Sequence, residues 1–194
     1  MHCTAFLGMS LDGFIAGPNG ELDWLDHVPA PPSNDMGYGA LIESVDAIVM
    51  GSVTFDVVAG FGGDWPYTVP VIVMSKSMTE LPAEVGDVEL TSLEPAELIE
   101  ELASRGMTHL YIDGGAVVRS FLEAELLDEL IATVLPVVLG NGIQVFGGVR
   151  ETAWFEHVSS EVFDNGFVQS RYVTANAQSA STHSANNETN ASPS

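Results

Sequence analysis

Basic residues are scarce in this chain. Its 194 residues include 5 Lys+Arg against 27 Asp+Glu, which gives a formal net charge of −22 at pH 7, and Lys76 is the only lysine. A surface this acidic repels the phosphates of nucleic acids and anionic lipid headgroups. We therefore expect no nucleic-acid partner and no membrane association.

The acid excess has two interpretations. Acidic residues are spread along the chain from Asp12 to Asp164 and form no single block. A dispersed acidic surface with almost no lysine is typical of a halophilic protein, because concentrated salt screens the repulsion among its charges. A docking surface for a basic partner is the alternative. We predict salt adaptation.

Cysteine and targeting signals are also scarce. Cys3 is the only cysteine, which excludes an internal disulfide and a cysteine-based zinc site. The histidines show no metal-ligand spacing, so we predict no metal. The first residues lack the basic region of a signal peptide, and the apolar stretch 130–139 is too short and proline-interrupted to span a bilayer. We predict a cytoplasmic protein.

The chain is apolar enough to build a core. Hydrophobic residues make up 46% of it, and the length fits a single domain. Residues 176–194 contain no large apolar residue. We therefore predict one domain over residues 1–175, followed by a disordered polar tail over 176–194.

Short apolar runs alternate with helical patterns along this domain. The expected helices are Asp35–Val45, Phe55–Ala59, Pro95–Ser104 and Ala116–Ala124. The expected strands are Thr4–Met9, Ala47–Met50, Val69–Met74, Val88–Leu90, Leu110–Ile112, Leu130–Val138, Phe155–Phe163 and Phe167–Val173. Asp164-Asn165-Gly166 predicts a hairpin between the last two. This pattern predicts an α/β domain with a mixed sheet.

Polar and glycine-rich segments follow three of the expected strands. They are Gly51–Thr54, Ser75–Ser77 and Asp113–Ala116. Open α/β sheets bind ligands at the carboxyl ends of their strands, and helix N-termini present free N–H groups to phosphates. Each segment alone is typical of an ordinary strand-to-helix turn. Together they favour binding of a dinucleotide.

Five segments, in this order, resemble the dihydrofolate reductase superfamily. They are SLDGFIA (Ser10–Ala16, with Gly20 and Trp24), DAIVMGSVTF (Asp46–Phe55), VIVMSKS (Val71–Ser77), YIDGGAVVRSFL (Tyr111–Leu122) and LPVVLGNGIQVFGG (Leu135–Gly148). The chain is most similar to the branch that contains the reductase domain of the bifunctional riboflavin-biosynthesis deaminase–reductase. The resemblance implies a three-layer α/β/α fold whose mostly parallel sheet ends in an antiparallel hairpin.

The resemblance also implies NADPH as cofactor and a small heterocyclic substrate. It places the pyrophosphate at Gly51–Thr54 and at Gly114-Gly115, with Ser75 and Lys76 at the ribose 2′-phosphate. The cofactor-binding residues implied in this way are Gly8, Ile15, Ala16, Gly51, Ser52, Thr54, Ser75, Lys76, Gly114, Gly115, Ala116 and Val117. Ser52 stands where the family commonly has arginine, which leaves the preference for NADPH over NADH open. A homodimer is also implied by the resemblance.

Three further residues are candidates for the substrate site. Asp35 lies 16 positions before Gly51, where dihydrofolate reductases place the carboxylate that assists ring protonation. The alternative for Asp35 is a helix cap. Asp12 and Trp24 are candidate substrate contacts, with a turn role and a core role as their alternatives.

Three functions remain open at this point. The first is a reductase acting on 5-amino-6-(5-phosphoribosylamino)uracil or a related pyrimidine, the second a dihydrofolate or pteridine reductase, and the third a non-catalytic nucleotide-binding sensor. Phe14 stands where riboflavin reductases usually carry lysine, and few arginines remain to hold a substrate phosphate. We expect Arg119 to face away from the site.

Overall fold

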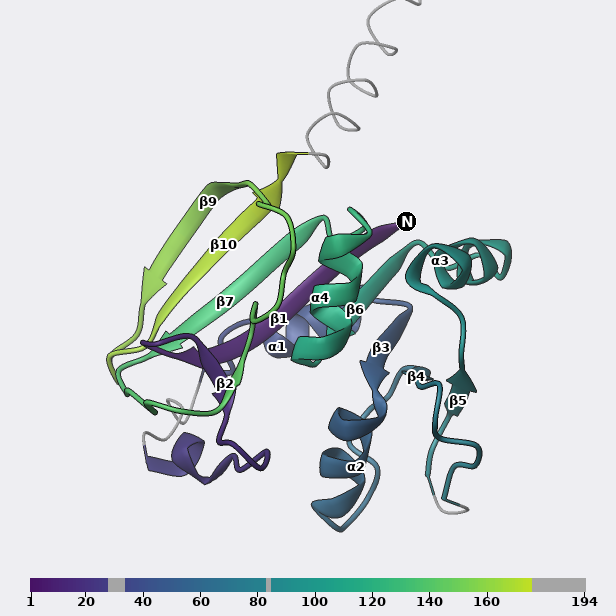
Figure 1. The fold of residues 1–194 in the computed structure, drawn as a ribbon, viewed down its shortest axis with the longest axis horizontal. Helices are drawn as coiled ribbons and strands as arrows, with labels where there is room; N and C mark the ends of the chain where they lie inside the picture. Colours follow the sequence, from purple (N-terminus) through teal and green to yellow (C-terminus); the bar gives the residue numbers. More distant parts are fainter. Residues whose placement is uncertain (28–33, 83–84, 176–194) are drawn as a thin grey trace, which may run out of the picture.

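An eight-stranded sheet forms the centre of the molecule (Figure 1), with strand order β5-β4-β3-β6-β1-β7-β10-β9. The computed structural model describes residues 1–27, 34–82 and 85–175. The strands are β1 (His2–Ser10), β3 (Ala47–Gly51), β4 (Val71–Met74), β5 (Val88–Thr91), β6 (His109–Asp113), β7 (Glu129–Leu135), β9 (Phe155–Val162) and β10 (Val168–Thr174). Neighbours from β5 to β7 are parallel, whereas β10 pairs antiparallel with both β7 and β9.

Helices cover both faces of the sheet. They are α1 (Tyr38–Ser44), α2 (Ser52–Gly60), α3 (Pro95–Ser104) and α4 (Gly115–Glu123). Helices α3 and α4 pack on one face through residues such as Leu98 and Phe121, and α1 and α2 pack on the other through Leu41 and Phe55. The predicted three-layer α/β/α fold with a mostly parallel sheet is therefore confirmed.

Strands β3 and β4 are apolar throughout because both of their faces are covered. In β3, Ile48 and Met50 join the core beneath α1 and α2, while Ala47 and Val49 join the core beneath α3 and α4. Side chains alternate between the faces of a strand, so a strand between two helical layers has no polar face. The hairpin is also confirmed, since Gly166 takes a φ of 83° and Phe163 N–H donates to the Phe167 carbonyl at 2.9 Å.

Some element boundaries differ from the prediction. Helix α1 begins at Tyr38 and not at Asp35, because Met36 and Gly37 adopt φ angles of 57° and 85° that no α-helix contains. Strand β7 ends at Leu135 because Pro136 has no N–H to continue the ladder. Helix α2 is longer than predicted and begins at Ser52, directly after β3.

Three short elements were not predicted. Strands β2 (Phe14–Ala16) and β8 (Ile143–Gln144) form a separate antiparallel pair, and η1 (Asp23–His27) is a 3-10 helix. The predicted tail over 176–194 lies outside the described residues. Within the described ranges, no helix is long and apolar enough to cross a membrane, and no cluster of His, Cys, Asp and Glu is arranged to hold a metal ion.

A buried carboxylate ties β1, β7 and β10 together. Glu129 is 4% exposed and pairs with Arg171, and it also accepts hydrogen bonds from His2 at 3.3 Å and from Thr4 at 3.4 Å. Burial alone raises the pKa of Glu129, but the hydrogen bonds from His2 and Arg171 outweigh it and lower that pKa. The bond to Glu129 raises the pKa of His2.

We predict that Glu129→Gln lowers stability most between pH 4.5 and pH 6.5, the ordinary pKa values of Glu and His. The stability contributed by Glu129 is fully present above pH 4.5 and is lost as the pH falls through its lowered folded-state pKa. The stability contributed by His2 is fully present below pH 6.5 and is lost as the pH rises through its raised folded-state pKa. Urea unfolding at fixed KCl should show a loss of about 1–3 kcal/mol in that window. Glu161→Gln, on the exposed face of β9, is the control, and a pH-independent loss would contradict this account.

Candidate functional site

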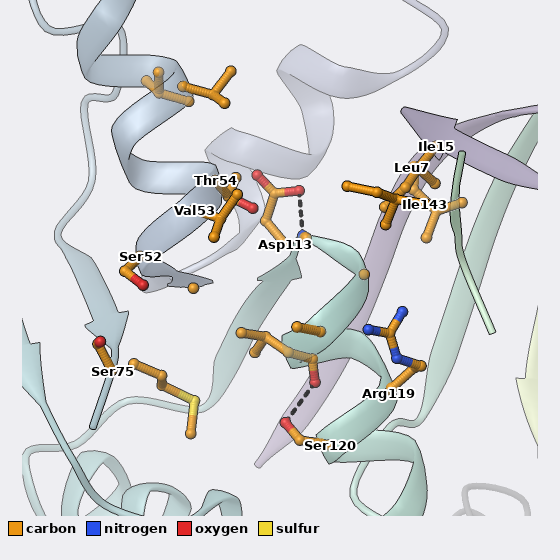
Figure 2. Close-up of a pocket in the computed structure, with 18 of the residues that line it drawn as sticks. Leu7, Ile15, Ser52, Val53, Thr54, Ser75, Asp113, Arg119, Ser120 and Ile143 are labelled. Carbon is orange, nitrogen blue, oxygen red and sulfur yellow. Dashed lines mark hydrogen bonds between the residues drawn. The ribbon is translucent and has the colours of Figure 1, made fainter. Parts of the chain in front are cut away.

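A cavity of about 800 Å³ opens where β3, β4 and β6 end. Figure 2 shows Ser52 and Ser75 on one side of it and Leu7, Ile15 and Ile143 on the other, with Thr54 and Asp113 between them. These three strands are neighbours and parallel, so their carboxyl ends reach the same edge of the sheet. The volume is that of a site for a sizeable organic ligand.

Two helices begin at the wall of this cavity. Helix α2 follows Gly51 and α4 follows Gly114, and neither glycine can supply a side-chain cap to the first turn. The N–H groups of a first helical turn have no partner within the helix, and they favour negative charge. Both N-termini are therefore suited to an anionic group such as a phosphate.

Backbone replaces side chains at the turn between β6 and α4. Gly114 has a φ of 83°, and a Cβ at this position would overlap the Thr54 hydroxyl. A Cβ at Gly115 would lie 2.7 Å from Cδ1 of Ile15. Glycine is required at Gly114 by its positive φ and by Thr54, and the absence of side chains at both positions leaves the peptide groups themselves at the cavity wall.

The carboxylate of Asp113 lies at the centre of the site. Burial raises its pKa above the ordinary aspartate range, although contacts with the Tyr111 hydroxyl and the Gly114 N–H act in the opposite direction. The Gly114 N–H donates to Asp113 Oδ1 at 2.8 Å. Sequence analysis treated Asp113 only as part of a turn. Its position as the last residue of a parallel strand is the signal that identifies it.

Aromatic rings form a wall beside Asp113. Tyr38 packs edge-on against Phe6 and Tyr111, with ring centroids 5.8 Å and 6.3 Å apart. The Tyr111 hydroxyl donates to the Phe6 carbonyl at 3.0 Å. Val53 on α2 and Phe61 directly after it also line the cavity and are 68% and 70% exposed. An apolar aromatic wall with one carboxyl group can hold a flat, polar-edged ring.

Two cations line the cavity, and both have partners. The Lys76 ammonium pairs with Glu94, and both residues line the cavity. One nitrogen of Arg119 donates to the carbonyls of Gln144 at 2.9 Å and Val145 at 3.0 Å. The prediction that Arg119 faces away from the site is wrong, because its side chain lines the cavity beside Gly115.

The structure brings together all the residues predicted to bind the cofactor. Each of the following lines the cavity: Gly8, Ile15, Ala16, Gly51, Ser52, Thr54, Ser75, Lys76, Gly114, Gly115, Ala116 and Val117. They come from distant parts of the sequence, so their convergence results from the parallel order of β3, β4, β6 and β1.

The predicted catalytic residue lies elsewhere. Asp35 is exposed and absent from the cavity lining, and its carboxylate accepts hydrogen bonds from the N–H groups of Gly37 at 3.0 Å and Gly39 at 2.7 Å. These contacts satisfy N–H groups at the start of α1. The arrangement favours the helix-capping alternative for Asp35.

The two other predicted substrate contacts also have structural partners. Asp12 accepts hydrogen bonds from Ser10 at 2.7 Å and from the Gly140 N–H at 2.7 Å, and these bonds lower its pKa. Trp24 is 8% exposed and packs with Leu135 and Phe163. Neither side chain lines the cavity. Their surroundings favour the turn role for Asp12 and the core role for Trp24.

Comparison with known proteins gives one family match and several similar chains. The model of the RibD C-terminal domain family matches residues 1–169. The uncharacterized protein YwjB of Bacillus subtilis (strain 168) is 30% identical over 173 residues, which cover 88% of this chain and 96% of YwjB.

Solved structures agree with this match. The "Putative riboflavin biosynthesis protein" from Shewanella sp. PV-4 is 41% identical, with a TM-score of 0.85, and the alignment covers 90% of this chain and 99% of that one. A dihydrofolate reductase from Enterococcus faecalis, solved with NADP(H), is 21% identical with a TM-score of 0.60 over 90% of this chain and 96% of its own. The similarity to this dihydrofolate reductase shows that the two chains share a fold.

We predict that Gly114→Ala destabilises the protein more than Gly106→Ala does. Both glycines have positive φ, of 83° and 88°, but only a Cβ at Gly114 meets another atom within 4 Å. In thermal or urea unfolding, Thr54→Ala should recover about 1 kcal/mol of the Gly114→Ala loss, because it removes the overlapping hydroxyl. If the effects of Gly114→Ala and Thr54→Ala simply add, the close packing described here is incorrect.

Proposed function

The chain belongs to the RibD C-terminal domain family, and from this membership and the geometry of its cavity we propose that it is an NADPH-dependent reductase acting on a pyrimidine- or pteridine-type substrate. The proposed reaction type is that of 5-amino-6-(5-phosphoribosylamino)uracil reductase, in which a hydride reaches C1′ of the opened ribose. One observation carries the proposal: two helix N-termini and a lysine meet along a single cavity at the ends of parallel strands.

The residues of the cavity fit NADPH. The first turns of α2 and α4, at Gly51–Thr54 and Gly114-Gly115, would hold the pyrophosphate, because their N–H groups lack side-chain caps and glycine lets the backbone approach closely. Ser75 and Lys76 would contact the ribose 2′-phosphate. When bound, the dihydronicotinamide supplies the hydride.

The opposite side of the cavity would hold the nicotinamide. Gly8, Ile15 and Ala16 line it, and none of them carries a polar side-chain atom. Apolar walls orient a flat ring and exclude water from the reacting atoms. Ile15 also packs within reach of the Gly115 backbone, which ties this wall to the proposed pyrophosphate turn.

Asp113 is the proposed substrate-contacting carboxyl group. It lines the cavity beside Tyr38 and Tyr111, whereas Asp35 does not line it. Its raised pKa means that it holds a proton at higher pH than an ordinary aspartate, so it can share a proton with a ring nitrogen or hydroxyl of the substrate. Asp35 is the acid that the family resemblance predicts, and substitution of each residue in turn distinguishes which of the two acts on the substrate.

A dihydrofolate or pteridine reductase is the second candidate. The aromatic wall of Phe6, Tyr38 and Phe61 favours it, because such a wall suits a bicyclic ring as well as a single one. Parallel assays with the phosphorylated pyrimidine and with dihydrofolate distinguish the two candidates. Binding of NADPH without reduction of any substrate would instead identify a nucleotide-binding sensor.

Domain extent, assembly and setting form part of the same proposal. We propose that residues 1–175 are the reductase domain, which is supported by the continuous core from β1 to β10. A homodimer through a sheet edge is supported by β9, an edge strand whose Val158 and Val162 are exposed. The acidic composition supports a cytoplasm of high salt as its setting.

We predict opposite effects for the two partners of the ion pair in the cavity. Lys76→Ala should weaken NADPH binding at least about tenfold and change NADH binding by less than about threefold, because only NADPH carries the 2′-phosphate. Glu94→Gln should strengthen NADPH binding, because it releases the ammonium group from Glu94. Glu100→Gln on the exposed side of α3 is the control. Equal effects on both nucleotides would place the 2′-phosphate elsewhere.

We predict that Asp113→Asn lowers kcat/KM at least about tenfold and stabilises the fold at pH 7. Because burial raises the folded-state pKa of Asp113 from 3.8, any stability from this group is present below 3.8 and lost as the pH rises through the raised value. The asparagine side chain carries no charge, so the cost of burying a carboxylate is absent from the variant.

Asp35→Asn should instead weaken α1 and change kcat/KM by less than about threefold. The reverse kinetic pattern would assign the acid to Asp35.

A further inference from the structure

The placement of every basic side chain bears on the charge of the substrate. The chain has five Lys and Arg residues, and all of them lie in the described ranges. Three are far from the cavity: Arg105 pairs with Glu89, Arg171 pairs with Glu129, and Arg150 lines a separate hollow at the other end of α4. The undescribed residues 28–33, 83–84 and 176–194 contain no Lys or Arg, and the one histidine among them is His183.

The two cations that line the cavity are both at the proposed cofactor site. Lys76 lies with Ser75 at the adenosine end and is paired with Glu94. Arg119 has its Nη1 3.2 Å from the Cβ position of Gly115, so it lies against the proposed pyrophosphate turn, and two backbone carbonyls hold that nitrogen. Figure 2 shows it near Ile143, on the other side of the cavity from Ser75. No histidine of the described residues lines the cavity.

The remaining wall offers nothing that balances a phosphate. It includes the rings of Phe6, Tyr38, Phe61 and Tyr111 and the carboxyl group of Asp113, and apart from Lys76 and Arg119 no described residue that lines the cavity is basic. The helix N-termini of α2 and α4 serve the cofactor in the proposed arrangement. A phosphate dianion placed beside a carboxylate without a cation is disfavoured by the repulsion between the two negative charges.

We infer that the substrate is an unphosphorylated pyrimidine or pteridine, a neutral ring compound whose N–H, NH₂ or hydroxyl groups face Asp113. This inference rests on the proposed reductase function and narrows its substrate. The reaction remains the addition of a hydride from the cofactor and a proton to one C=N or C=O bond, with oxidation of NADPH to NADP⁺. The phosphate of the family's riboflavin-pathway compound has no counterpart in this cavity.

A matched pair of ligands tests the inference. The full chain, saturated with NADP⁺ at fixed KCl, is titrated with 5-amino-6-ribosylaminouracil and with its 5′-phosphate, and kcat/KM for both is measured with NADPH. We expect the unphosphorylated compound to bind at least about tenfold more tightly and to be the better substrate by a similar factor. Neutral dihydrobiopterin and a phosphorylated dihydropterin form a second pair with the same expectation.

The outcomes separate this inference from the proposed function. Equal or tighter binding of the phosphorylated member of either pair would overturn the inference. Binding of NADPH without binding of any of the four compounds would overturn the substrate class. Absence of NADPH binding to the folded protein would overturn the reductase function itself.

An added cation supplies the complementary test. Phe61→Lys places an ammonium group directly after α2, on the side of the cavity assigned to the substrate, where Phe61 is 70% exposed. It should improve binding of the phosphorylated pyrimidine to the NADP⁺-loaded protein by about tenfold relative to the unphosphorylated one. Val162→Lys, at a 73% exposed position on β9, is the matched control. An unchanged ratio in Phe61→Lys would contradict the assignment of this wall to the substrate.

Discussion

The packing of the Gly114 backbone against Thr54 is the constraint on which the site depends. It joins the turn after β6 to the first turn of α2, and no side chain larger than hydrogen fits between them. This contact keeps two helix N-termini open on the same cavity. Because the peptide groups form the wall there, the site can attract an anion with very few basic residues.

Using backbone groups in place of basic side chains would allow so acidic a protein to bind the proposed phosphorylated cofactor. Backbone N–H groups carry no net charge, so they remain compatible with a chain whose formal charge is −22. One lysine and one arginine complete the cavity, each already held by a neighbouring group. The electrostatics of the site therefore depend on where these two cations lie.

Much of the fold could be predicted from the sequence because its signals are local. Buried parallel strands are continuous apolar runs, and Pro95 marked the first residue of α3 correctly. Strands β2 and β8 escaped prediction because each is very short and is stabilised only by the other. The start of α1 was misplaced because the positive φ of Met36 has no clear sequence signal.

The site was predicted where backbone turns define it and missed where side chains meet through the fold. The polar and glycine-rich segments Gly51–Thr54, Ser75–Ser77 and Asp113–Ala116 pointed to the cavity at the strand ends, and the family resemblance added Gly8, Ile15 and Ala16. Asp113 was missed because its raised pKa arises from burial, which depends on how distant parts of the chain pack around it. The predicted orientation of Arg119 was wrong because its partners, Gln144 at the end of β8 and Val145 directly after it, lie at a strand pair that was itself not predicted.

The most direct test of the account is a titration of the unmodified protein with NADPH in which binding is monitored by nicotinamide fluorescence. About 2–3 M KCl suits an acidic chain, since salt at that concentration screens its charges almost completely. The account predicts saturable binding with a dissociation constant in the micromolar range, which corresponds to a standard free energy of binding of about −8 kcal/mol. A folded sample that binds neither NADPH nor NADH would contradict it.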